Sequence, residues 1–175
     1  MTTTKNSSTA PSRFPLAGLA NDGWSNEHEA TATCFCGAVQ LAVPLKAPAL
    51  VNTFLCHCAD CHKITSSMFT SNFTALSSSV RHIRGQSNLK TLKQDKTPSS
   101  GSAVTNFTCG TCGSLMYRVS EAFPSIMVLR TGTVDDFGLH GSVFKPGVEV
   151  FTGCRAGWLG RVEGAMQDEG LVFEA

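Results

Sequence analysis

The chain has 175 residues and a mass of 18.6 kDa, which suits a single domain with its own hydrophobic core and excludes large multidomain machinery. Hydrophobic residues make up 42% of the sequence and charged residues only 15%, so we expect a globular domain rather than a disordered chain or a coiled coil. The 14 Lys and Arg residues nearly balance the 13 Asp and Glu residues. The resulting net charge of +1 argues against nucleic acid as a partner.

The sequence contains no run of about 18 apolar residues, which is the length that a transmembrane helix needs. The first ten residues are mostly polar and lack the apolar centre of a signal peptide. We therefore expect a cytoplasmic protein that does not bind a membrane.

Residues 1–28 are rich in Thr, Ser, Asn and Pro, which predicts a flexible N-terminal arm in front of a domain spanning residues 29–175. Beyond the arm, short runs of apolar and β-branched residues alternate with turn-forming residues. These runs predict strands at residues 38–43, 50–55, 71–76, 80–83, 89–92, 104–108, 114–119, 125–130 and 148–151. No stretch longer than about ten residues has helical periodicity. The expected fold is a single, mainly β domain.

Seven of the eight cysteines fall in three clusters, and only Cys154 stands apart. The clusters are Cys34 and Cys36, then Cys56, Cys58 and Cys61, then Cys109 and Cys112. In the reducing compartment expected for this chain, closely spaced cysteines are more often metal ligands than disulfides. The clusters therefore predict metal binding.

The segment Cys109-Gly-Thr-Cys112-Gly113 has the pattern of a zinc knuckle between two strands, as in zinc ribbons. Its glycines allow the unusual backbone angles of a tight turn. One knuckle supplies two thiolates, whereas a structural zinc needs four ligands. Cys34-Phe-Cys36-Gly37 is the natural second pair, because it also ends in a glycine. We expect this zinc to join two distant parts of the domain.

The cluster of Cys56, Cys58 and Cys61 offers three thiolates, which is the number that leaves a zinc ion one open position for chemistry. A fourth ligand from His57 or His62 would instead close the site and make it structural. Two zinc ions per chain are expected in either case. His57, Asp60 and His62 could also orient a proton or tune the cysteine ligands, or they could be ordinary polar residues at a strand end.

Two arginines, Arg130 and Arg155, are candidate partners for a carboxylate, because a guanidinium binds this group in a two-pronged fork. A structural salt bridge is the commoner use of such a residue. Both alternatives stay open from the sequence.

Four motifs in this order are similar to those of a known family: Cys34-Phe-Cys36-Gly37-Ala-Val39, Cys56-His-Cys58-Ala-Asp-Cys61, Cys109-Gly-Thr-Cys112-Gly113-Ser and Gly132-Thr-Val-Asp-Asp136. Over about residues 33–165 the chain resembles the glutathione-dependent formaldehyde-activating enzymes, which are grouped with centromere protein V-like proteins. The tail resembles that of fungal members through Glu149-Val-Phe151, Arg155, Trp158 and Gly164-Ala-Met-Gln167.

This resemblance implies a zinc-containing β-tent fold, similar to that of zinc-containing methionine sulfoxide reductases. It implies a structural zinc held by Cys34, Cys36, Cys109 and Cys112, and a catalytic zinc held by Cys56, Cys58 and Cys61. The implied activity is that of a carbon–sulfur lyase, which joins glutathione to formaldehyde to give S-hydroxymethylglutathione. Glutathione is thus a candidate co-substrate.

One departure from the family pattern affects the expected substrate. Members close to the founding enzyme often carry a His-Ile pair after the Gly-Thr-x-Asp-Asp turn, whereas this chain has Glu149-Val150. We therefore expect a thiol–aldehyde adduct, or a related sulfur-conjugated or carbonyl metabolite, as the substrate.

Two other classes of function compete with the lyase. One is a non-catalytic zinc module that binds protein or nucleic acid. The other is a thiol redox enzyme that uses Cys154, whose neighbour Arg155 could lower the pKa of the thiol.

Overall fold

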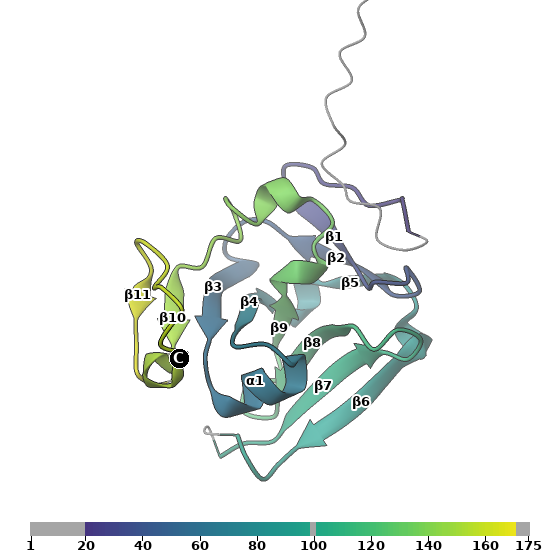
Figure 1. Cartoon of the computed structure of the whole chain (residues 1–175). Helices are drawn as coiled ribbons and strands as arrows, with labels where there is room; N and C mark the ends of the chain where they lie inside the picture. Colours follow the sequence, from purple (N-terminus) through teal and green to yellow (C-terminus); the bar gives the residue numbers. More distant parts are fainter. Residues whose placement is uncertain (1–19, 99–100, 171–175) are drawn as a thin grey trace, which may run out of the picture.

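The computed structural model describes residues 20–98 and 101–170, and within them the chain forms two β-sheets and one short α-helix (Figure 1). The smaller sheet has the strand order β1-β2-β5, with β1 (Glu29–Thr33), β2 (Gln40–Pro44) and β5 (Arg81–Arg84). The larger sheet has the order β11-β10-β3-β4-β9-β8-β7-β6. Its strands are β3 (Leu50–Cys56), β4 (Thr70–Leu76), β6 (Leu89–Gln94), β7 (Val104–Cys109), β8 (Leu115–Ser120), β9 (Ile126–Arg130), β10 (Val148–Val150) and β11 (Met166–Gln167).

The helix α1 (Ala59–Thr65) directly follows β3, and short 3-10 helices occupy several of the connections. These are η1 (Ser77–Ser79), η2 (Gln86–Asn88), η3 (Thr131–Thr133), η4 (Phe137–Leu139) and η5 (Thr152–Cys154). No helix in the described part of the chain is long and apolar enough to cross a membrane.

The prediction of a mainly β fold is confirmed, and each predicted strand overlaps an observed one. Sequence reasoning missed β1, β11 and α1. Strand β1 consists of small and polar residues, Glu-Ala-Thr-Ala-Thr, and lacks the large side chains that mark a buried strand. Helix α1 has only seven residues, which is too short to show periodicity.

The main core lies between the small sheet and one face of the large sheet. Successive side chains of a strand point to opposite faces, so Phe73 of β4, Tyr117 of β8 and Leu129 of β9 share this face. They pack in one buried cluster with Leu41 of β2 and with Phe144, whose ring centroid lies 4.4 Å from that of Phe73. Each such fully buried side chain stabilises the fold by roughly 1.5–3 kcal/mol.

The opposite face of the large sheet carries α1 and a second, smaller buried cluster. Phe54 and Cys56 of β3 pack there with Cys61 of α1 and Val150 of β10. Figure 1 shows α1 beside β4 on this side of the sheet. The fold therefore places Cys56 and Cys61 together away from the main core.

Part of the expected N-terminal arm lies outside the described residues, namely residues 1–19. Residues 20–28 contact the domain. Asp22 forms an ion pair with Arg84 of β5 at 2.5 Å, and the Ser25 hydroxyl donates a hydrogen bond to Asp136 at 2.6 Å.

Candidate metal centres

The four cysteines Cys34, Cys36, Cys109 and Cys112 come together at the junction of the two sheets. Cys34 and Cys36 lie in the turn between β1 and β2, and the other two lie at the turn between β7 and β8. All four Sγ atoms are within 4.8 Å of one another. The Sγ atom of Cys36 is 3.6 Å from that of Cys34 and 3.8 Å from that of Cys109. A tetrahedral zinc with bonds of about 2.3 Å places its sulfur ligands about 3.8 Å apart, so this cluster could hold such an ion.

The two turns that present these cysteines have matching backbone hydrogen bonds. The Cys34 N–H donates to the carbonyl of Val39, and the Cys109 N–H donates to the carbonyl of Ser114, five residues onward in each case. Gly37 and Gly113 have φ angles of +79° and +76°, a conformation that side chains disfavour. Gly37 and Gly113 therefore have the backbone role expected of them, whereas Gly110 of the knuckle does not have a positive φ angle.

The second cluster consists of Cys56, Cys58 and Cys61, whose Sγ atoms also lie within 4.8 Å of one another. Cys56 ends β3, Cys58 caps the N-terminus of α1, and Cys61 lies in the first turn of this helix. The Cys58 Sγ accepts a hydrogen bond from the Cys61 N–H at 3.4 Å. The short helix that the sequence did not predict thus brings the third thiol to the first two.

The crowding of the three thiols changes their pKa values in opposite directions. Hydrogen bonds with Cys58 and Cys61 raise the pKa of Cys56, because its thiol keeps its proton and donates. Hydrogen bonds from Cys56 and Cys58 lower the pKa of Cys61 to about 2. A metal cation would replace these shared protons and hold the sulfurs as thiolates, which is the form that binds zinc. The donor set therefore fits zinc.

His57 lies between two of these cysteines in sequence and is only 1% exposed. Its Nε2 donates to the Oε2 atom of Glu149 at 2.8 Å, whereas its Nδ1 is buried and has no hydrogen-bond partner among the described residues. Strand β10 carries Glu149 and runs parallel to β3, with Val150 paired to Cys56. This pairing brings the tail of the chain to the three-cysteine cluster.

Glu149 is fully buried and is held by several partners from the tail. Arg155 forms an ion pair with it at 2.9 Å, and the Val162 backbone and the Gln167 amide donate hydrogen bonds to its Oε1. Burial alone would raise the pKa of Glu149, but the hydrogen bonds from Val162 and His57, together with Arg155, lower it. Glu149 therefore stays a carboxylate at neutral pH.

Sequence reasoning noted Glu149 and Gln167 in the tail and Arg155 as a candidate carboxylate partner, but it did not connect any of them with His57. The sequence alone does not reveal the contact of His57 with Glu149, because this contact depends on the parallel pairing of β10 with β3. Of the two uses considered for Arg155, the structure shows the salt bridge.

The other candidate residues lie outside the three-cysteine cluster. Neither His57 nor His62 brings a ring nitrogen into it within the described part of the chain. Asp60 accepts a hydrogen bond from Thr97 at 2.8 Å. Cys154 is exposed and belongs to neither cluster, and all eight cysteines are free thiols.

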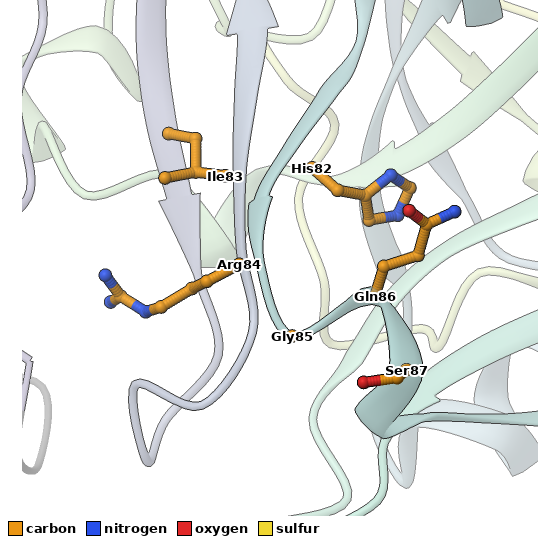
Figure 2. Close-up of a pocket in the computed structure, with 6 residues that line it drawn as sticks. All are labelled: His82, Ile83, Arg84, Gly85, Gln86 and Ser87. Atoms are coloured by element: carbon orange, nitrogen blue, oxygen red, sulfur yellow. The ribbon is translucent and has the colours of Figure 1, made fainter.

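A surface hollow of about 500 Å³ lies at the end of β5 and shares no residue with either cysteine cluster (Figure 2). Residues His82 to Ser87 line it, and Figure 2 shows Ile83 and Arg84 pointing away from His82 and Gln86. Arg84 donates to the Gly37 carbonyl at 2.7 Å and so supports the turn of the four-cysteine cluster. The polar side chains that line the hollow therefore do not converge on one point.

Comparison with known proteins identifies the family. The model of the family described as "Glutathione-dependent formaldehyde-activating enzyme" matches residues 29–154. A crystal structure of a Rhodobacter sphaeroides protein is similar, with a TM-score of 0.46 and 23% sequence identity, over 59% of this chain and 85% of that chain. No curated protein matches the chain in sequence. Because the family model covers well over half of its residues, this chain belongs to the family of glutathione-dependent formaldehyde-activating enzymes.

Proposed function

We propose that the chain is a zinc-dependent carbon–sulfur lyase that reversibly joins a thiol, such as glutathione, to an aldehyde or a related carbonyl compound. One observation carries the proposal: three thiols converge beside a buried histidine whose ring is held by a buried carboxylate. Membership of the family supports glutathione as the thiol and formaldehyde as the aldehyde.

Two zinc ions per chain fit the two clusters. Cys34, Cys36, Cys109 and Cys112 would hold the first with four thiolates, which is a closed structural set. Cys56, Cys58 and Cys61 would hold the second with three thiolates, because neither neighbouring histidine joins them in the described residues. A set of three leaves one position for a substrate atom. When bound there, zinc supplies Lewis acidity, which favours the thiolate form of a thiol and polarises a carbonyl oxygen.

In the forward reaction the thiol sulfur forms a bond to the carbonyl carbon, and the proton of the thiol ends on the carbonyl oxygen. We assign His57 the role of holding this proton. Because Nε2 donates to Glu149, the unpartnered Nδ1 is the nitrogen that can accept it. The reverse reaction breaks the carbon–sulfur bond and returns the proton to sulfur.

The proposal is tested by zinc content and thiol binding, measured on the wild type and on Cys58→Ser. We expect two zinc ions per wild-type chain and one in the folded variant. Calorimetry should show glutathione binding to the wild type alone, and NMR should show faster formation of S-hydroxymethylglutathione only with the wild type. One zinc per chain in both proteins, without glutathione binding, would contradict the proposal and leave a structural zinc module.

A further inference from the structure

The thiols of the four-cysteine cluster have hydrogen-bonding partners outside the cluster. Three of these partners belong to the same turn as their thiol: Val39 for Cys34, Ala38 for Cys36 and Ser114 for Cys112. The Sγ atom of Cys109 instead accepts a hydrogen bond from the side-chain Nδ2 of Asn88, at 3.5 Å. Asn88 lies in η2, outside both cysteine turns. A third segment of the chain therefore contacts this cluster.

Asn88 ends a short segment that contacts both cysteine turns. We call residues 84–88, from the end of β5 through η2, the bridging segment, and most of it is labelled in Figure 2. At its start, Arg84 Nε donates to the Gly37 carbonyl of the β1–β2 turn at 2.7 Å. At its end, the Asn88 carbonyl accepts the Gly110 N–H of the β7–β8 turn, also at 2.7 Å. The bridging segment thus connects the two halves of the cluster.

Two glycines allow these contacts, because their neighbours leave no room for a Cβ atom. At Gly85 a Cβ would lie 2.0 Å from the carbonyl oxygen of Ala38, and at Gly110 it would lie 2.7 Å from the carbonyl oxygen of Asn88. Both obstacles are backbone atoms, which cannot rotate away as the end of a flexible side chain would. The backbone of the bridging segment therefore packs directly against both turns.

The Asn88 amide suits the charge that zinc binding would bring to this cluster. Four thiolates around a divalent ion leave an excess of negative charge on the sulfur atoms. N–H groups that point at these sulfurs stabilise this charge and adjust how strongly each thiolate binds the metal. Asn88 is half-buried, and its Nδ2 also donates to the Thr111 hydroxyl at 3.1 Å, which orients the amide. The amide is thus held with an N–H group toward Cys109.

We propose that the bridging segment is a third element of the four-cysteine metal site, in which Asn88 supports the Cys109 thiolate and strengthens zinc binding. This inference rests on the zinc that the proposed function assigns to these four cysteines, and it does not depend on the lyase reaction. Asn88 is a positioning residue, since it acts on the metal through a cysteine.

The test measures metal binding by Asn88→Asp in the full chain with Cys58→Ser as the parent, so that the three-cysteine cluster does not contribute. Competition with a chelator gives the zinc affinity. We expect Asn88→Asp to bind zinc about 10–100-fold more weakly, because a carboxylate replaces the amide donor and repels the thiolate. In the cobalt(II)-substituted protein, the sulfur-to-cobalt charge-transfer band should move to lower energy, because a thiolate without this hydrogen bond gives up electron density more readily.

Two further variants separate the hydrogen bond from the added charge. Asn88→Leu removes the amide without adding a charge, and it should change zinc affinity and the cobalt band in the same directions by a smaller amount. Gly110→Ala should do the same, because its Cβ would push the Asn88 carbonyl away from the turn.

Asn26→Asp is the matched control for the aspartate substitution. The Oδ1 atom of Asn26 accepts hydrogen bonds from the backbone N–H groups of His28 and Glu29, and a carboxylate accepts them equally well. This variant should therefore keep the zinc affinity and the cobalt spectrum of the parent.

The inference is overturned if both Asn88 variants bind zinc as tightly as the parent. It is also overturned if they bind zinc more weakly while the cobalt band stays in place, which would make Asn88 a purely structural residue. In either case the proposed function stands. If the parent holds no zinc, the zinc assignment of the four cysteines fails and this inference fails with it.

Discussion

The Nε2 atom of His57 lies 2.8 Å from the Oε2 atom of Glu149, although the two residues are 92 positions apart in the chain. The contact connects the segment that carries three cysteines with the tail strand β10. It fixes the direction of the imidazole ring and the nitrogen that carries the proton.

Glu149→Gln tests this contact, because the amide keeps the shape of the side chain and removes its charge. We expect the rate of thiol addition to fall by about 10–100-fold, because His57 loses the carboxylate that orients its ring and stabilises its protonated form. Glutathione affinity should change little. Steady-state kinetics and calorimetry check both expectations, with Glu121→Gln as a control, since exposed Glu121 pairs with exposed Lys93 far from His57 in sequence. Unchanged kinetics in Glu149→Gln would contradict a role for His57 in proton transfer.

Loss of the four-cysteine cluster should lower the melting temperature more than loss of the three-cysteine cluster. The four-cysteine cluster joins the β1–β2 turn to the β7–β8 turn, so Cys36→Ser should lower the melting temperature strongly. Cys58→Ser should lower the melting temperature less, because its cluster lies within one continuous segment of chain. Thermal unfolding with parallel zinc analysis measures the difference. Cys154→Ser is the control, because exposed Cys154 belongs to neither cluster. Equal drops in melting temperature in Cys36→Ser and Cys58→Ser would contradict a special structural role for the four-cysteine cluster.

Gly37→Ala should destabilise the protein and weaken zinc binding at the four-cysteine cluster. A Cβ atom at Gly37 would lie 2.8 Å from the Cβ of Ala20, and the φ angle of +79° disfavours any side chain. The left-handed conformation alone costs roughly 1–2 kcal/mol. Chemical denaturation measures this loss. Gly141→Ala is a matched control, since nothing lies within 4 Å of its Cβ position, and a similar loss there would show that the turn geometry is not the cause.

Asp135 should make stability depend on pH in the acid range. Burial raises the pKa of Asp135 above its model-compound value of 3.8, despite hydrogen bonds from Thr31 and Thr33. Since the folded state holds this proton more tightly than the unfolded state, the carboxyl contributes least when both states are ionised. Asp135→Asn should therefore gain stability relative to the wild type as pH rises from below 3.8 through the folded pKa. Denaturation of both proteins at a series of pH values measures the difference, and a gain that grows toward lower pH would contradict it.

The cysteine motifs are visible in the sequence because each of them is local, whereas the meeting of Cys34 and Cys36 with Cys109 and Cys112 is a long-range contact. In Cys109-Gly-Thr-Cys112-Gly113 both the sulfur donors and the turn that presents them lie within five consecutive residues. The strands were predicted for the same reason, since alternation of apolar residues is a property of short segments.

The parts that sequence reasoning missed depend on long-range pairing. The contact of His57 with Glu149 requires the parallel register of β3 and β10. The burial of Arg130 beside Asn72 depends on the pairing of β9 with β4, and no local pattern in the sequence indicates it. Helix α1 depends on the Cys58 cap and on packing against β4 rather than on periodicity.

Because β10 pairs in parallel with β3, the candidate site combines residues from two separate parts of the chain. Every clustered cysteine precedes residue 113, whereas Glu149, Arg155 and Gln167 all come from the tail. The tail adds to the sheet at an edge, through β10 and β11, without entering the strand order of the four-cysteine cluster. A change in this edge segment would therefore replace the partner of His57 and leave the residues of both cysteine clusters in place.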